Sequence, residues 1–171
     1  MAEFISLYSG SSGNSSVVRC GAQYLIVDMG KGVRTTTAAL KSLGLAVSDC
    51  AGILVTHEHS DHVKGLSTFL KKNPLPVYGA AATLDFLDAN GIVPASCELR
   101  TLSGGEEDVG DFGVTMFPTS HDAAESIDFR VDHDGASIGI LTDTGVVTPE
   151  AEQVLQGVGL LVLESNHDVE W

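Results

Sequence analysis

Apolar and polar residues follow one another along the chain in short blocks that predict strands interspersed with helices. Short apolar runs, several of them bounded by Gly, Ser, Asn or Asp, are typical of strands. We expect them at residues 3–8, 16–20, 24–28, 52–55, 76–79, 97–102, 112–118, 126–131, 136–141 and 160–163. Longer stretches with helical character are expected at residues 32–43, 63–72, 80–90 and 148–156. The last of these has Pro149 in its first turn, a position that proline favours.

Two segments carry more specific expectations about their surroundings. Residues 104–108 combine two glycines with three acidic residues, which predicts a solvated turn. Residues 160–163 are all apolar, which predicts a buried strand. The length of 171 residues allows one domain with a sizeable core, and we expect that domain to span residues 1–171.

The charge of the chain narrows the classes of partner. It has nine Lys and Arg against 23 Asp and Glu, a formal net charge of −14. That balance excludes broad electrostatic binding to nucleic acid or to an anionic membrane, but it allows a metal-centred site that binds one phosphate locally. The three cysteines are scattered without a CxxC pair, and neither a signal peptide nor a membrane-spanning run is visible. We therefore expect a cytoplasmic protein with no membrane partner.

The densest chemistry lies directly after the apolar run 52–55. His57, His59, Asp61 and His62 follow within a few residues, where a strand ends and a helix begins. His57 and His59 are two apart in extended backbone, so their side chains point to the same side, whereas Asp61 and His62 point elsewhere. This arrangement suits two adjacent metal ions, and imidazole with carboxylate suits zinc, manganese or iron. A polar loop with chance histidines is the alternative.

Further candidate ligands follow other predicted strands. His121 comes after 112–118, Asp143 after 136–141, and both Glu164 and His167 after 160–163. Side chains at strand ends form one site along one edge of a sheet, held on rigid elements. Asp28 also ends a strand, and it is either a partner for a metal-bound histidine or a turn residue.

The loop between the first two predicted strands is far richer in Gly and Ser than a tight turn needs. Its sequence is Ser9-Gly10-Ser11-Ser12-Gly13-Asn14-Ser15. Exposed backbone N–H groups and hydroxyls there could bind an anion. A plain flexible hairpin loop is the other interpretation.

These motifs together resemble the metallo-β-lactamase superfamily. The pattern His57-x-His59-x-Asp61-His62, followed by His121 and Asp143 after later strands, carries the likeness. The Gly/Ser loop, Thr142-Asp143-Thr144-Gly145 and Glu164-Ser165-Asn166-His167-Asp168 look like the YycJ/WalJ-like branch. The resemblance implies a four-layer αββα sandwich with the site at the edge between two sheets. It also implies metal-dependent hydrolysis of phosphodiesters, with DNA as the expected substrate.

The resemblance assigns the candidate ligands one by one. His57, His59 and His121 match the first metal site, Asp61 and His62 match the second, and Asp143 matches the bridging carboxylate. Family members continue past the last residue here and supply a further histidine to the second site. We therefore expect two divalent ions, the second weakly bound. We also expect the chain to be either a fragment or a self-associating protein with residues 160–163 near an exposed edge.

The expected reaction proceeds through a metal-activated hydroxide. Asp61 is the candidate that orients the nucleophile, and His167 is the candidate general acid, with a loop hydrogen bond as its alternative role. Substrate-binding candidates are Ser11, Ser12, Gly13 and Asn14. The competing functions are a thioester or lactone hydrolase, because the same ligands serve that chemistry, and a non-enzymatic metal-binding module.

Overall fold

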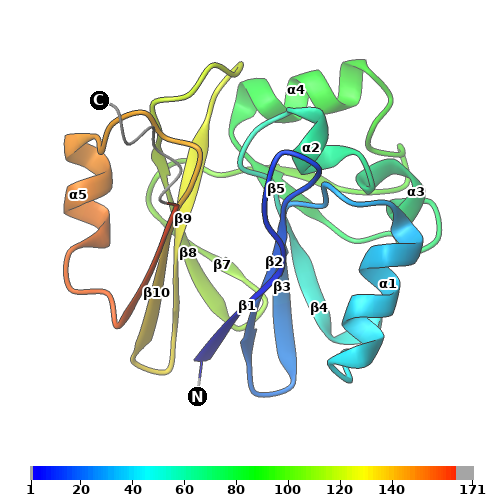
Figure 1. The fold of residues 1–171 in the computed structure, drawn as a ribbon, viewed down its shortest axis with the longest axis horizontal. Coiled ribbons are helices and arrows are strands. Elements are labelled where there is room, and N and C mark those ends of the chain that lie inside the picture. Colours follow the sequence, from blue (N-terminus) through cyan, green and yellow to red (C-terminus); the bar gives the residue numbers. More distant parts are fainter. Residues whose placement is uncertain (1, 165–171) are drawn as a thin grey trace.

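The computed structural model describes residues 2–164, which form two facing β-sheets with helices on both outer sides (Figure 1). Apolar residues of both sheets meet in a shared core, among them Leu25 and Leu54 from one sheet and Val114 and Phe129 from the other. A second apolar cluster joins the first sheet to its helices, and a smaller one joins the second sheet to a single helix. The expected four-layer αββα architecture is confirmed.

The first sheet has six strands in the order β1-β2-β3-β4-β5-β6. β1, β2 and β3 are antiparallel neighbours, whereas β3 to β6 run parallel to one another. Its strands are β1 (Ala2–Tyr8), β2 (Ser15–Cys20), β3 (Gln23–Val27), β4 (Cys50–Leu54), β5 (Val77–Gly79) and β6 (Leu99–Thr101).

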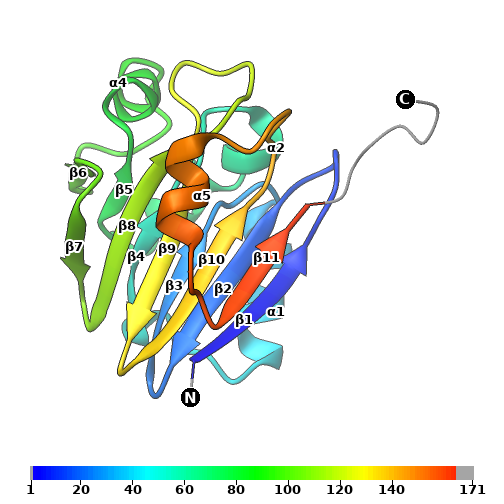
Figure 2. The ribbon, with the colours of Figure 1, turned by 90° about the vertical axis from the view of Figure 1, so that its left-hand side faces the viewer.

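The second sheet has five strands in the order β11-β10-β9-β8-β7 (Figure 2). β7 to β10 are antiparallel neighbours, and the edge strand β11 runs parallel to β10. Its strands are β7 (Glu106–Val109), β8 (Phe112–Pro118), β9 (Ile127–His133), β10 (Ala136–Leu141) and β11 (Leu160–Leu163).

The helices cover the outer faces of the two sheets. α1 (Val33–Ser42), α3 (Leu66–Leu70) and α4 (Ala81–Ala89) pack on the first sheet, and α5 (Pro149–Leu155) lies on the second (Figures 1 and 2). Thr148 caps α5, because its hydroxyl accepts a hydrogen bond from the N–H of Ala151 at 3.0 Å. The short α2 (Ser60–Val63) and the 3₁₀ turn η1 (Val47–Asp49) complete the set. Within residues 2–164, no helix combines the length and the apolar character needed to cross a bilayer.

Three expectations from the sequence are wrong in detail. The predicted helix at 63–72 is two short helices, separated where the N–H of Gly65 donates to the Met29 carbonyl at 2.8 Å. Residues 106–108 of the predicted turn belong to β7, because this segment pairs with β8. Residues 160–163 do form a strand, but Leu160, Leu161 and Leu163 are 45%, 47% and 55% exposed, so within residues 2–164 β11 is an open edge rather than a buried strand. The exposed edge that we expected there is confirmed.

Candidate metal centre

The candidate ligands come together because several strands end on one side of the molecule. His57 follows β4, His121 follows β8 and Asp143 follows β10. Among residues 2–164, two groups of three side chains there could hold a metal ion, and His57 belongs to both. In each group, one ligand atom from every residue lies within 4.8 Å of the others.

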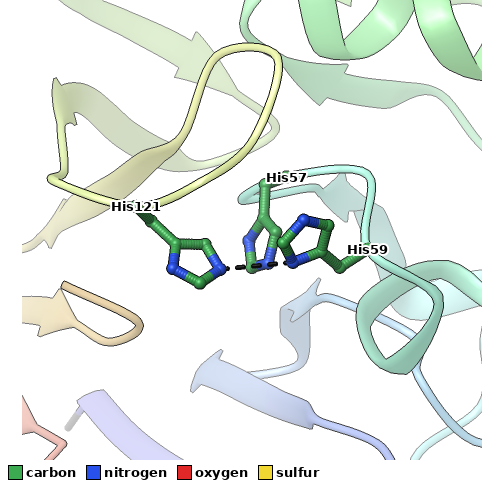
Figure 3. Close-up of side chains that lie close together, drawn as sticks. All are labelled: His57, His59 and His121. Atoms are coloured by element: carbon green, nitrogen blue, oxygen red, sulfur yellow. Dashed lines mark hydrogen bonds between the residues drawn. The ribbon is translucent and has the colours of Figure 1, made fainter.

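The first group consists of His57, His59 and His121 (Figure 3). Nε2 of His121 lies 3.2 Å from Nδ1 of His59. The ring centroid of His57 lies 4.6 Å from that of His59 and 4.7 Å from that of His121. Two nitrogens on one zinc ion, each at about 2.1 Å, lie at most about 4.2 Å apart, so the closest pair satisfies this limit. The three imidazoles therefore lie together as the sequence predicted, and their role as metal ligands stays a prediction.

His57 has the environment of a metal ligand. Its side chain is buried, and its Nδ1 pairs with the Thr56 hydroxyl at 2.9 Å. Its Nε2 is buried and has no hydrogen-bond partner among the described residues. Burial, assisted by the nearby His62, lowers the pKa of His57 to about 4, so the ring is neutral at pH 7. A neutral imidazole with one free nitrogen is the form that binds a metal ion, and the donor set therefore fits one.

The second group consists of His57, His62 and Asp143. Nε2 of His62 lies 3.1 Å from Oδ2 of Asp143 and 3.7 Å from Oδ2 of Asp61. The expectation that His62 points away from His57 is wrong, since their ring centroids are 4.0 Å apart. α2 causes this, because its first turn brings the N–H of His62 back to the His59 carbonyl at 2.8 Å. Asp61 lies beside the group rather than within it.

Asp28 connects the histidine motif to the end of β3. One of its carboxylate oxygens lies 2.8 Å from Nδ1 of His62 and accepts the Thr56 hydroxyl, also at 2.8 Å. The other accepts the N–H of Thr56 at 2.9 Å. Burial disfavours a charged His62, but Asp28 and Asp143 outweigh it and raise the pKa of His62 to about 10. The structure thus favours the interpretation of Asp28 as a partner of a histidine. Because Asp28 contacts Nδ1 of His62, the other ring nitrogen, Nε2, faces the site.

The Gly/Ser loop is bonded to the histidine motif by its backbone. The N–H of Asn14 donates to the Asp61 carbonyl at 2.7 Å, and the N–H of Gly30 donates to the Asn14 carbonyl at 2.8 Å. A Cβ on Gly13 would lie 2.6 Å from the Gly30 carbonyl oxygen, so the two segments are in close backbone contact. The loop therefore faces the site, while it also connects β1 and β2 as a hairpin.

Three backbone donors of the loop that we expected to meet a ligand are engaged within the protein. The N–H groups of Gly10, Gly13 and Asn14 already have acceptors in the protein. The Asn14 amide nitrogen points into the site, 3.2 Å from Oδ2 of Asp61 and 3.0 Å from Nε2 of His62.

Beside the second group lies a cavity of about 660 Å³, between β1 of the first sheet and β10 and β11 of the second. Ser11, Asn14, His62 and Asp143 are among the residues that line it. Ser12 and Gly13 do not line it, and the Ser12 hydroxyl accepts a hydrogen bond from Lys31 at 2.7 Å. Of the loop candidates, only Ser11 and Asn14 are placed to meet a ligand.

Glu164, directly after β11, makes a contact at the site but is not among the candidate metal ligands of the described residues. Glu164 accepts the N–H of Asp143 at 2.7 Å and belongs to neither group of ligand atoms. It therefore supports the Asp143 backbone. His167 lies outside the described residues.

Two further carboxylates at the site escaped the sequence analysis. Glu58 accepts the N–H of Ala124 at 2.8 Å and so ties the histidine motif to the loop that carries His121. Asp128 accepts two hydrogen bonds from Thr142, the residue before Asp143. In the sequence, only the position of Glu58 between two histidines indicates a role at the site. Nothing in the sequence indicates one for Asp128, since it lies between apolar residues of a strand.

Comparisons with known proteins agree with this geometry. A family model described as "Beta-lactamase superfamily domain" matches residues 23–170. The chain is 39% identical over 168 residues to exodeoxyribonuclease YycJ of Bacillus anthracis, covering 98% of this chain and 64% of the relative. It is 33% identical over 180 aligned positions to ribonuclease Z of Mycobacterium avium, covering 88% of this chain and 63% of the relative. The chain thus spans less than two thirds of these relatives.

Solved structures show the same fold. Zn(2+)-bound PqqB from Methylobacterium extorquens aligns with a TM-score of 0.78 at 15% identity, covering 96% of this chain and 72% of that one. Human tRNase Z, short form, aligns with a TM-score of 0.66 at 24% identity, covering 94% of this chain and 76% of that one. Fold, motif order and family model agree, and the chain belongs to the metallo-β-lactamase superfamily, through its β-lactamase superfamily domain.

Proposed function

We propose that this protein is a metal-dependent phosphodiesterase that acts on DNA. The observation that carries the proposal is the pair of donor groups that share His57 and lie beside the Gly/Ser loop. Relatives named as an exodeoxyribonuclease and a ribonuclease support a phosphodiester substrate. The net charge of −14 argues for recognition of a short stretch of nucleic acid at the site, rather than along a long basic surface.

The donor set favours divalent zinc or manganese, with iron as a further candidate. His57, His59 and His121 would hold the first ion, and His62 and Asp143 would hold the second. Asp61, whose Oδ2 lies 3.7 Å from Nε2 of His62, would be a further ligand of the second ion. If His57 serves the first ion, the second group keeps a single imidazole, so we propose that the second ion binds more weakly. Bound divalent ions lower the pKa of water and stabilise negative charge that develops on a phosphate.

The remaining chemistry belongs to side chains around the ligands. Oδ2 of Asp61 accepts the Asn14 amide and is partly exposed, so Asp61 can also orient an attacking water. Asp28 holds His62 by its Nδ1 and keeps Nε2 turned toward the site. The assignment of His167 as general acid rests on its position in the sequence alone.

The test of this proposal compares substrates under defined metal conditions. The purified protein is stripped of metal, supplied with Zn²⁺ or Mn²⁺, and assayed on single-stranded DNA, bis(4-nitrophenyl) phosphate, a thioester and a lactone. We expect hydrolysis of the two phosphodiesters only. Faster turnover of the thioester or lactone would favour the alternative hydrolase, and tight metal binding without any turnover would favour a non-enzymatic module.

The loop makes a separate prediction about substrate binding. Ser11→Ala combined with Asn14→Ala should lower kcat/KM for bis(4-nitrophenyl) phosphate about 10- to 100-fold, because hydrogen bonds to charged groups contribute about 1.5–3 kcal/mol. Steady-state kinetics measure the effect. Ser48→Ala, an exposed serine on η1 whose hydroxyl contacts Asp49, is the control and should keep normal kinetics. Unchanged kinetics in the double variant would exclude a substrate role for the loop.

The open edge of β11 leads us to propose self-association. An exposed apolar edge strand offers unpaired backbone groups to a second copy. We expect a dimer in analytical ultracentrifugation, converted to monomer by Leu161→Lys. Phe86→Lys changes an exposed apolar residue on α4 and should leave the dimer intact. A wild-type protein that stays monomeric at high concentration would contradict this.

The compartment is also a proposal. Cys20, Cys50 and Cys97 are all free. Free thiols are typical of a reducing compartment, and we propose that the protein works in the cytoplasm.

A further inference from the structure

Asp128 is a fully buried carboxylate that the proposed reaction does not use. It lies in β9, between the two apolar residues Ile127 and Phe129, and its exposed fraction is 0%. Its Oδ2 accepts both the N–H of Thr142 at 2.6 Å and the Thr142 hydroxyl at 3.0 Å. Its Oδ1 accepts the N–H of Phe129 at 3.0 Å. A buried carboxylate is costly unless donors surround it, and here three donors do so.

The contact between Asp128 and Thr142 repeats the contact between Asp28 and Thr56 on the other sheet. Asp28 likewise accepts the N–H and the hydroxyl of its threonine, at 2.9 and 2.8 Å. Each threonine stands immediately before a candidate ligand, Thr56 before His57 and Thr142 before Asp143. Both sheets thus contain the same aspartate–threonine contact, at the point where a strand ends just before a candidate ligand.

The two contacts are joined to one another. The N–H of Ile127, the residue before Asp128, donates to the Thr56 carbonyl at 3.1 Å. Hydrogen bonds therefore lead from Asp28 through Thr56 to the start of β9, and from Asp128 through Thr142 to Asp143. This series crosses from one sheet to the other and links the histidine motif with the carboxylate.

Asp143 needs such support because its backbone is unusual. Its φ of 44° lies in the left-handed region, which non-glycine residues rarely adopt. Its N–H is held by Glu164 at 2.7 Å, and the preceding residue is held by Asp128. Backbone of this kind persists only where surrounding contacts fix it.

We propose that Asp128 is a positioning residue, which acts through Thr142 to hold the Asp143 carboxylate where it meets the ion shared with His62. The inference rests on the proposed function, since it takes Asp143 to be a metal ligand. Residues that hydrogen-bond directly to a metal ligand typically change metal affinity 10- to 100-fold when they are lost, and Asp128 acts on the residue next to such a ligand.

Burying the charged form of Asp128 costs free energy, and the hydrogen bonds from Thr142 and Phe129 offset that cost only in part. Burial raises the pKa of Asp128 to about 8, although the Thr142 and Phe129 donors favour the charged form. An apolar residue at this position would avoid that cost and would suit the interior of β9. The carboxylate instead fixes Thr142, and that is the role it has for the metal centre.

The experiment titrates Co²⁺ into metal-free protein and follows the visible absorption band of the bound ion. We expect Asp128→Asn to weaken binding of the ion that depends on Asp143 by 10- to 100-fold, because the new amide group opposes one of the N–H donors. Thr142→Val should also weaken binding, whereas Thr142→Ser keeps the hydroxyl and should bind within about twofold of wild type. In the double variant Asp128→Asn with Thr142→Val, the losses should not add, because both remove one contact.

Val131→Ala is the matched control for a merely structural effect. Val131 is a buried residue of the same strand, away from Thr142, so its truncation lowers the melting temperature without touching the centre. We expect it to keep the Co²⁺ affinity and the absorption band of wild type. If Asp128→Asn behaves like Val131→Ala, the inference is overturned.

Asp143→Asn separates this inference from the proposed function. Weaker Co²⁺ binding in Asp143→Asn with normal binding in Asp128→Asn would overturn the inference and leave the metal centre standing. Unchanged binding in Asp143→Asn would overturn both. Amide hydrogen exchange of Thr142 in metal-free protein gives an independent readout, and Asp128→Asn should accelerate it at least 10-fold. Unchanged exchange at that amide would also overturn the inference.

Discussion

Replacing His57 with alanine should remove metal binding from the first group and lower kcat/KM for bis(4-nitrophenyl) phosphate about a thousandfold. His57 is the only residue that belongs to both groups of candidate ligands among the described residues. A bound divalent ion contributes several kcal/mol to the transition state. A loss of roughly 4 kcal/mol corresponds to about three powers of ten in rate.

The experiment needs a histidine control that leaves the centre alone. His133 lies at the end of β9, where its Nδ1 donates to the Asp111 carbonyl at 2.7 Å, so His133→Ala removes an imidazole elsewhere. Metal content and hydrolysis are measured on both variants after equal exposure to Zn²⁺ or Mn²⁺. Full metal content and full turnover in His57→Ala would show that the buried Nε2 of His57 has a different role.

The part of the site that could be predicted from sequence is the part that strand ends determine. His57, His121 and Asp143 each follow an apolar run, and parallel or paired strands bring such positions to one edge. The spacing of His57 and His59 also predicted that their side chains would face the same point. These inferences need only the period of a strand and the place where it stops.

What could not be predicted depends on contacts between distant segments. The break between α2 and α3 exists because Gly65 meets the backbone of residues 29–31, which local helical periodicity does not reveal. The charged segment 106–109 forms a strand because β8 offers it a partner. Asp128 looks like a polar interruption in an apolar strand until Thr142 is seen beside it.

The Gly/Ser loop could be predicted from the sequence only in part. Its composition indicated a function, but its partners are two backbone segments that the sequence does not place beside it. Asn14 bonds to Asp61 on one side and to Gly30 on the other, and the N–H of Met29 donates to the His62 carbonyl at 2.6 Å. The loop, the end of β3 and the histidine motif thus form one hydrogen-bonded unit, which explains why glycine is needed where they cross.

Gly30→Ala should strongly destabilise the folded state. A Cβ at Gly30 would lie 1.6 Å from the Asp61 carbonyl oxygen and 2.6 Å from the Asn14 nitrogen, and neither backbone atom can move without breaking the unit. We expect the free energy of unfolding to fall by about 3 kcal/mol or more, measured by urea denaturation, with weaker metal binding at Asp61 and His62. Gly32→Ala is the matched control, because nothing lies within 4 Å of the Cβ it would add, and its stability should stay within about 0.5 kcal/mol of wild type. If Gly30→Ala were as stable as Gly32→Ala and kept its metal affinity, the close backbone crossing would not be what fixes the histidine motif.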